Sequence, residues 1–295
     1  MKLKKFFLLL PLALLAGCKD GHYLPEGNNI NVILLMGQSN ATGVALFSDL
    51  EANDPSTYSQ FCSGFDNVSF SQQCENASAE GINKFHKLGK NKSYKAKQFG
   101  PELGIGKWMN EHSTKPTFII KSSLGGSNLN NQWLNQFGGR GNLYNTALNY
   151  CKGKLKVLTK SNKKIDSLSV CWMQGESDNF YDYSLYEQNT KSLIKFLRED
   201  YKSYSSNISF IDAYISSTTR NSNGEVVWPN ANLINAAKQR VADEDPLVAT
   251  IKTNGEDQEA LNLITKTEDP AHYDAVSQVA LGEEFAKKII NFIGE

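Results

Sequence analysis

Three absences narrow what this chain of 295 residues can be. It lacks an excess of positive charge, because 31 acidic side chains balance its 31 basic ones, so nucleic acid is not an expected partner. It lacks any Cys and His spacing that resembles a zinc site, and it has only four histidines. It also lacks an apolar run close to the ~20 residues that a membrane-spanning helix needs.

The first residues instead read as an export signal. Met1–Lys5 carries three lysines, Phe6–Leu15 is almost wholly apolar, and Leu15-Ala16-Gly17-Cys18 follows. A charged start, a short apolar stretch and small residues are the order of a secretory signal. The ending resembles the bacterial lipobox, in which the cysteine becomes the lipid-modified first residue of the mature protein. An ordinary signal peptide with an incidental Cys18, or a buried helix, is the alternative.

We therefore expect a signal peptide at 1–17, a lipid on Cys18 and a short tether at 18–29. The protein would be an exported bacterial lipoprotein, held on a membrane through that lipid and facing the periplasm or the cell surface.

Four further cysteines could form disulfides after export. Cys62 and Cys74 lie in one polar segment, where a bridge between them would close a loop. Cys171 lies in an apolar strand pattern, where a buried free thiol is the commoner state. Together with Cys151 these residues allow three pairings, and the sequence does not choose among them.

After residue 100 the chain alternates between apolar strand patterns and amphipathic helix patterns. The predicted strands are 31–36, 117–121, 165–172, 208–214 and 247–251, and the predicted helices are 102–111, 142–159, 183–204, 231–242 and 275–293. This alternation, without an internal repeat, predicts one α/β domain at 30–295 with a mainly parallel sheet between helices. The segment at about 49–98 is polar and has little periodicity, so we expect an inserted excursion from the core there.

Polar loops follow several of the predicted strands. In a parallel sheet, ligands bind at the carboxyl ends of the strands, and the loops expected there are 37–40, 122–128 and 173–178, with 269–272 before the last helix. A hydroxyl nucleophile needs a base and an acid that orients the base, and Ser39, His272 and Asp269 supply these groups. Taken alone, Ser39 would serve equally well as a helix cap, and it lacks a Gly-x-Ser-x-Gly elbow.

Five blocks of sequence together resemble a known family. They are Gly37-Gln38-Ser39-Asn40, Phe99-Gly100-Pro101-Glu102, Gly125-Gly126-Ser127, the run from Trp172 to Asp178, and Asp269-x-x-His272. In this order they resemble the sialate O-acetylesterase and acetylxylan esterase group, carbohydrate esterase family six of the SGNH hydrolases. The resemblance implies a three-layer, flavodoxin-like α/β/α fold and the removal of acetyl groups from sugars without a metal or other cofactor.

Carried over by position, the resemblance makes Ser39 the nucleophile, His272 the base and Asp269 its orienting acid. The oxyanion donors would be the backbone N–H groups of Ser39 and Gly125 and the side-chain amide of Gln174.

The resemblance also draws attention to residues around these groups. Glu176, Gln38 and Asn40 would either support the loops or contact substrate, and for Glu176 we favour the supporting role. Trp133 and Trp228 are candidate sugar contacts, although tryptophans mostly pack in cores.

The sequence therefore predicts a serine esterase that acts on an acetylated carbohydrate. One alternative is a glycan-binding lipoprotein that kept the fold without catalysis. Another is a lipase or thioesterase of the same superfamily, although long acyl chains need an apolar groove and the loops here are polar. The sequence does not say which glycan carries the acetyl group.

Overall fold

The first strand of the domain, β1 (Asn29–Gly37), lies in the middle of the main sheet and is buried from Ile30 onward. The structure is a computed structural model that describes residues 21–74, 84–90, 92, 95, 97–180, 183–256 and 258–295. Within these residues the main sheet has seven strands, in the order β4 (His86–Leu88), β3 (Phe65–Cys74), β6 (Thr117–Ser123), β1, β7 (Lys164–Met173), β8 (Ile208–Ala213) and β9 (Val248–Ile251). All pairings are parallel except that of β4 with β3.

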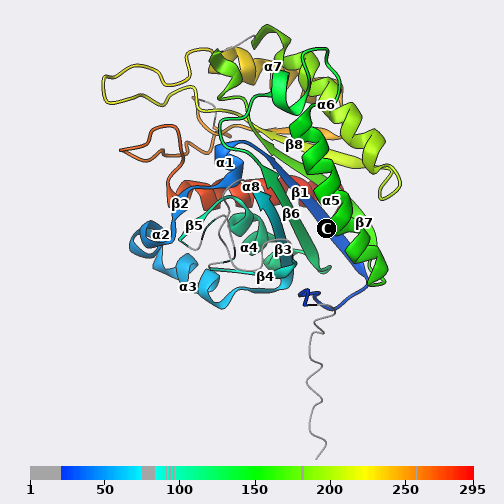
Figure 1. Ribbon diagram of the computed structural model, residues 1–295. Helices are drawn as coiled ribbons and strands as arrows, with labels where there is room; N and C mark the ends of the chain where they lie inside the picture. The colour runs from blue at the N-terminus through cyan, green and yellow to red at the C-terminus, as the bar shows by residue number, and fades with distance from the viewer. Residues whose placement is uncertain are drawn as a thin grey trace, which may run out of the picture.

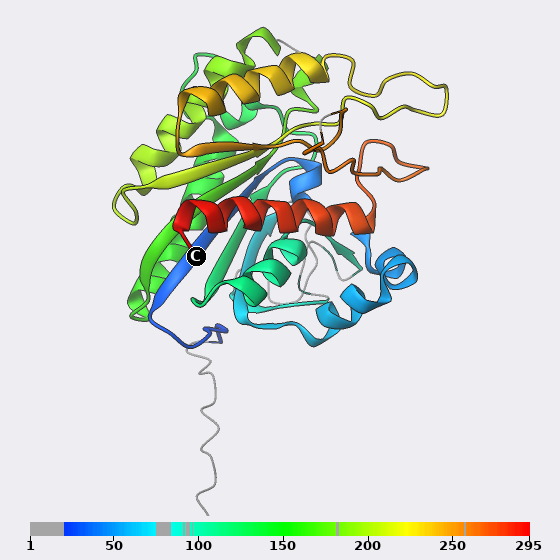
Figure 2. The ribbon, with the colours of Figure 1, turned by 180° about the vertical axis from the view of Figure 1, so that it is seen from behind.

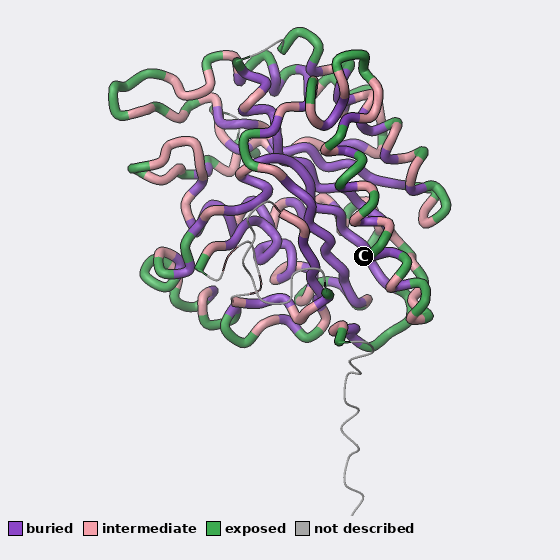
Figure 3. The backbone as a smooth tube through the Cα atoms, viewed as in Figure 1, coloured by how far each residue is buried: buried purple, intermediate pink, exposed green. Residues whose placement is uncertain are grey.

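Helices cover both faces of this sheet. The longer ones are α4 (Glu102–His112), α5 (Asn142–Lys160), α6 (Tyr186–Tyr201), α7 (Ala231–Glu244) and α8 (Ala275–Ile293). Helices α5 and α6 cover the face toward the viewer in Figure 1, and α4 and α8 cover the opposite face, seen in Figure 2. The strands between them are buried, while the tips of the connecting loops are exposed (Figure 3). The predicted α/β/α fold with a mainly parallel sheet is confirmed.

Smaller elements complete the fold. They are α1 (Ser39–Thr42), α2 (Phe47–Asn53), α3 (Pro55–Ser63), the paired strands β2 (Ala45–Leu46) and β5 (Gln98–Phe99), the π-helical turn η1 (Leu129–Trp133), and the 3₁₀ turns η2 (Asp178–Phe180) and η3 (Tyr183–Leu185). No helix in the described part of the chain is long and apolar enough to cross a membrane.

Where the apolar pattern is strong, the structure matches the predicted elements closely. Helix α8 has the predicted bounds, because Val279, Ala286 and Ile289 place one buried stripe against the sheet. Helix α6 begins three residues later than predicted, since the chain first makes the 3₁₀ turn η3.

Part of the segment 49–98 belongs to the core sheet, and for that part the prediction of an excursion is wrong. Its strand β3 pairs in parallel with β6, and Phe70 on β3 is fully buried. The polar residues of β3 concealed this role. Ser69 is buried with its hydroxyl donating to Tyr23 O at 2.7 Å, and the buried Ser71 hydroxyl lies 2.7 Å from the Tyr150 hydroxyl. Buried hydroxyls with partners are tolerated in a core, so an apolar pattern was not required here.

The structure contains none of the three pairings that the sequence left open among Cys62, Cys74, Cys151 and Cys171. Cys62 and Cys74 are both free, the former exposed and the latter partly buried. Cys74 ends β3, where its Sγ lies 3.3 Å from Ser123 Oγ. The buried free thiol predicted for Cys171 is confirmed, and Cys151 is likewise buried and free.

The chain joins the domain earlier than the predicted tether of 18–29 allows. The Tyr23 N–H donates to Phe85 O at 2.8 Å, the Tyr23 hydroxyl donates to Asp66 O at 2.8 Å, and Leu24 is buried. The Lys163 ammonium donates to Pro25 O at 2.5 Å. Residues 22–28 are therefore fixed to the domain, at the lower end of the sheet in Figure 1. Cys18 and the signal sequence lie outside the described residues.

The membership of β3 in the core gives a prediction for stability. Phe70→Ala should lower the free energy of unfolding by ~3–5 kcal/mol, because it removes a buried ring and leaves a cavity. Asp66→Ala, at an exposed position of the same strand, should change it by no more than ~0.5 kcal/mol. Urea unfolding measures both, and equal effects of the two substitutions would contradict a core role for β3.

Candidate active site

Three loops meet where β1, β6 and β7 end. After β1 the chain forms β3 and then β6 on one side of it, and next crosses to β7 on the other side, which makes this the point where the order of parallel strands reverses. The Gln38 N–H donates to Met173 O at 2.9 Å, and the Leu124 N–H donates to Gly37 O at 3.2 Å. These two bonds join the three loops at their start, next to α1 at the upper end of the sheet in Figure 1.

Ser39 begins α1 directly after this junction. Gly37 has a φ of 137°, and a Cβ there would lie 2.0 Å from Met173 O, so only glycine allows the chain to turn here. Ser39 is partly buried. A Cβ added to Gly125 would lie 3.8 Å from the Cβ of Ser39, so the backbone of Gly125 lies beside the predicted nucleophile. The two residues whose backbone N–H groups are predicted oxyanion donors thus lie side by side, and their role as donors stays a prediction.

His272 and Asp269 form the predicted pair. The His272 N–H donates to Asp269 O at 3.1 Å, which closes a turn that has Pro270 at its second position, where proline is favoured. His272 Nδ1 lies 2.7 Å from Asp269 Oδ2. The turn is not part of α8, whose cap is the Asp274 carboxylate. Because Asp269 engages Nδ1, the Nε2 atom is the one left to exchange a proton with a nucleophile.

The side chain of Asn40 connects the nucleophile loop to the histidine turn. Its Nδ2 donates to Ala271 O at 3.2 Å and to Glu176 Oε1 at 2.9 Å, and its Oδ1 accepts from the Tyr273 N–H at 3.2 Å. The residue after Ser39 therefore bonds to the residues on both sides of His272. Since Asn40 is buried, we assign it a supporting role rather than contact with substrate.

Glu176 lies behind Asn40 and is buried as well. Burial raises the pKa of its carboxyl group, while the hydrogen bond from Asn40 acts in the opposite direction. Within the described residues its second oxygen, Oε2, has no hydrogen-bond partner. The buried position agrees with the supporting role favoured for this residue.

Gln174 is fully buried and bonded on every side. Its Nε2 lies within donating distance of three oxygens, Gln38 Oε1 at 3.2 Å, Ser127 O at 3.0 Å and Asp178 Oδ2 at 2.5 Å. Its Oε1 accepts from the Tyr186 hydroxyl at 3.0 Å. The oxyanion role of Gln174 stays a prediction, and it requires the amide to exchange one of these acceptors for substrate.

Gln38 holds the loop that follows β7. Its Oε1 accepts from Gln174 Nε2 and also from the backbone N–H groups of Gly175 at 3.4 Å and Ser177 at 3.2 Å. Gln38 is buried, so it supports the loops and is not placed to touch substrate.

Two buried ion pairs beneath the loops were missed by sequence reasoning. Lys121 Nζ donates to Glu102 Oε2 at 2.9 Å and to Thr42 O, in α1, at 2.7 Å. Lys238 Nζ donates to Asp212 Oδ1 and to Gln174 O, each at 2.6 Å. A lysine inside the apolar pattern of β6 was the signal that could have revealed the first pair.

In the second pair, burial of the carboxyl group raises the pKa of Asp212 to about 6, although the positive charge of Lys238 opposes this rise.

The two tryptophans differ from one another. Trp133 is fully buried, with its Nε1 donating to Ser127 Oγ at 3.1 Å and its ring edge-on to Trp172, so its expected role as a sugar contact is corrected. Trp228 is partly buried beside Phe180, with ring centroids 5.6 Å apart, and Phe180 is 63% exposed. Of these two candidates, Trp228 is the one that keeps its ring near the surface.

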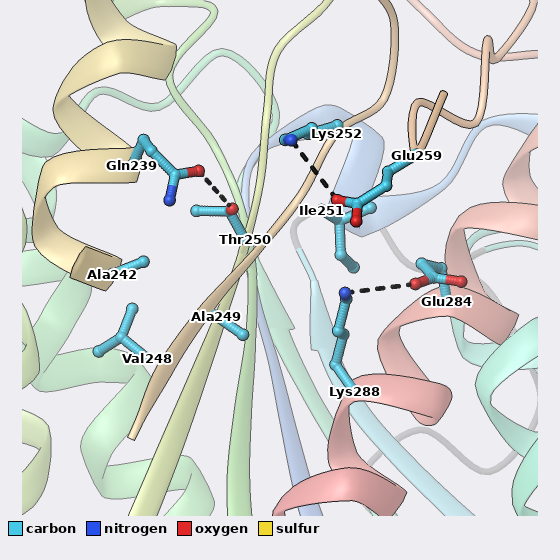
Figure 4. A pocket seen from close by; sticks show the side chains of 10 residues that line it. All are labelled: Gln239, Ala242, Val248, Ala249, Thr250, Ile251, Lys252, Glu259, Glu284 and Lys288. Atoms are coloured by element: carbon cyan, nitrogen blue, oxygen red, sulfur yellow. Dashed lines mark hydrogen bonds and ion pairs between the residues drawn. The ribbon is translucent and has the colours of Figure 1, made fainter. Parts of the chain in front are cut away.

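A cavity of about 540 Å³ lies away from this site, along β9 between α7 and α8 (Figure 4). Its lining includes the neighbouring side chains Gln239 and Thr250 and the pair Lys288 and Glu284. None of Ser39, His272 and Asp269 lines it. The described residues contain no group of three or more His, Cys, Asp or Glu side chains that could hold a metal ion.

The fold and the loops together define an α/β protein whose candidate site lies at the carboxyl ends of its parallel strands. Residues 29–291 match the profile of a family described as "Carbohydrate esterase, sialic acid-specific acetylesterase". The chain belongs to this acetylesterase family, whose members are carboxylic-ester hydrolases, and the resemblance seen in the five sequence blocks is confirmed. Among curated proteins, none matches this chain significantly.

Solved structures share the fold at low sequence identity. A protein from Arabidopsis thaliana has 20% identity and a TM-score of 0.62, covering 90% of this chain and 98% of its own. NanS has 15% identity and a TM-score of 0.62, covering 91% of this chain and 99% of its own. A carbohydrate acetylesterase from Xanthomonas citri has 14% identity and a TM-score of 0.56, covering 90% of this chain and 57% of its own.

The position of Asn40 predicts an effect on turnover. Asn40→Ala should lower kcat for 4-nitrophenyl acetate by about 10²-fold with a smaller change in KM, because His272 loses the bonds that fix its turn beside Ser39. The exposed Asn223→Ala serves as control. Stopped-flow kinetics on both variants, with near-UV circular dichroism to verify folding, test this. Unchanged kcat in a folded Asn40→Ala protein would refute the positioning role.

The buried carboxyl group predicts a pH dependence of stability. Because the folded-state pKa of Glu176 lies above its usual value of 4.5, the folded state binds the proton more tightly than the unfolded state. The contribution of Glu176 to the free energy of unfolding is thus most favourable at low pH, and it is lost as pH rises from 4.5 through the folded-state pKa. Glu176→Gln stays neutral, so its stability relative to the native protein should increase over that interval.

Urea unfolding at several values between about pH 4 and 8 measures this difference. Glu225→Gln, at an exposed position, is the matched control. A difference between Glu176→Gln and the native protein that does not vary with pH would contradict the prediction.

Proposed function

We propose that this protein is a carbohydrate O-acetylesterase that works through a Ser-His-Asp mechanism and an acetyl-enzyme. The observation that carries the proposal is the pairing of His272 Nδ1 with Asp269 at 2.7 Å, on a turn that Asn40 holds beside Ser39. Membership in the acetylesterase family supports the same chemistry.

In the first half of the reaction, Ser39 Oγ attacks the carbonyl carbon of the acetyl group while His272 Nε2 takes the hydroxyl proton. The Asp269 carboxylate stabilises the imidazolium that results. The N–H groups of Ser39 and Gly125 would bind the negative oxygen of the tetrahedral intermediate, and each such donor is typically worth ~10²–10³ in turnover. The bond to the sugar oxygen then breaks, and His272 gives that oxygen its proton.

In the second half, water replaces the sugar. His272 Nε2 takes a proton from the water, whose oxygen attacks the acetyl carbon on Ser39, and collapse of the second intermediate returns the proton to Ser39 and releases acetate. The same donors act in both halves, so one geometry serves acylation and deacylation.

An acetylated carbohydrate is the substrate class that we propose. The description of the family and the name of the Xanthomonas protein both refer to sugar acetates. Trp228, partly buried beside the exposed ring of Phe180, is the surface on which a sugar ring could stack. We further propose that a lipid on Cys18 anchors the exported protein, as its signal sequence indicates.

Substitution of the nucleophile tests the mechanism. Ser39→Ala should release no acetate from 4-nitrophenyl acetate, O-acetylated sialic acid or acetylated xylooligosaccharides, whereas the native protein releases it from at least the aryl ester. Only the native protein should react with a fluorophosphonate probe, which requires an activated serine.

The outcome separates the alternatives. Full activity of a folded Ser39→Ala protein would remove the proposed mechanism. A folded native protein that ignores both the esters and the probe would instead favour the glycan-binding alternative.

A further inference from the structure

The chain enters the domain at the end opposite the candidate active site. The Tyr23 N–H donates to Phe85 O, and the Tyr23 hydroxyl donates to Asp66 O, near the start of β3. Asn28 O accepts from the N–H of Lys164, the first residue of β7. Figure 1 shows the segment 22–28 at the lower end of the sheet and α1, which begins with Ser39, at the upper end.

A single strand separates these two ends. Strand β1 has nine residues and leads from the attachment to the nucleophile loop. At ~3.3 Å per residue it spans ~30 Å. The contacts of Tyr23 and Lys163 fix residues 22–28 to the domain, so these residues add no slack to the connection.

The connection to Cys18 is much shorter than this strand. Only Lys19 and Asp20 stand between Cys18 and Gly21. A chain of this length spans at most ~11 Å even when fully extended. If the active site faced the membrane that holds the lipid, Gly21 would lie ~30 Å above the membrane surface. This distance exceeds the ~11 Å that the chain between Cys18 and Gly21 can span. When the domain lies on its side, the site faces along the membrane and not into it.

We propose that the anchored enzyme does not hydrolyse acetyl esters held in its own membrane, and that its substrates are acetylated glycans that are soluble or that extend well beyond the surface of that membrane. This inference rests on the proposed esterase activity and on the proposed lipid at Cys18. It narrows the substrate class by geometry, independently of which sugar is recognised, and it disfavours a lipase that acts on the anchoring bilayer.

The test places enzyme and ester on the same vesicle. The native lipoprotein is reconstituted in phosphatidylcholine vesicles that contain a phospholipid with an acetoxycoumarin on its head group. A variant carries a flexible Gly/Ser insertion of about thirty residues between Asp20 and Gly21, whose mean extension of ~30 Å matches the strand. Turnover of soluble 4-nitrophenyl acetate, the mass of the N-terminal peptide and a Ser39→Ala blank are measured on the same preparations.

Both proteins should hydrolyse 4-nitrophenyl acetate equally, and both should hydrolyse the lipid ester once detergent has dissolved the vesicles. On intact vesicles the native protein should be at least about tenfold slower than the extended variant, because a linker that cannot span the distance gives almost no effective concentration. Equal rates on intact vesicles would overturn the proposal.

The remaining outcomes identify which premise fails. A folded native protein without activity on the soluble ester would overturn the esterase, and with it this inference. An active protein whose N-terminal peptide carries no lipid would leave the esterase standing and overturn the inference through its anchor.

Discussion

The hydrogen bonds of the Asn40 side chain are the contact on which the rest of the candidate site depends. Ser39 and His272 lie far apart in the sequence, and one amide side chain bonds the loop of the first to the turn of the second. Both donors and the acceptor of that amide are used, and the same side chain gives the buried carboxyl group of Glu176 its partner. A buried polar network of this kind specifies one arrangement of the loops, because leaving any member unpaired is costly.

Charges buried beneath the loops serve the same end. Lys121 and Lys238 each bond to a carboxylate and to a backbone carbonyl of the site, Thr42 O at the end of α1 for the first and Gln174 O in the loop after β7 for the second. A buried ion pair contributes little net stability, since desolvation offsets the attraction between its charges. Their value here is geometric. They fix the ends of β1 and β7 from below, so that the loops keep their positions while substrate binds and leaves.

The sequence predicted those parts of the molecule in which an apolar pattern or a local motif determines the structure. The buried run of β1, the stripe of α8 and the pairing of Asp269 with His272, three residues apart, are of this kind. Strand β3 was missed because Ser69 and Ser71 find partners far away in the chain, Tyr23 and Tyr150, which no local pattern contains. The sequence also did not reveal that Trp133 is buried or that the Gln174 amide already has hydrogen-bond partners. Both depend on contacts between side chains that only the fold brings together.

The central strand β1 also connects the segment by which the chain is attached to the domain with the loop that carries Ser39. Strand β1 begins where the chain is fixed to the domain and ends two residues before Ser39, so its length sets the distance between attachment and nucleophile. A parallel α/β sheet binds its ligand at the carboxyl ends of its strands. Any domain of this class that is anchored by a short segment before its first strand must therefore present its site away from the anchor. For an esterase of acetylated glycans this orientation suits the substrate, because a polymer can extend to the site, whereas a lipid in the same bilayer cannot.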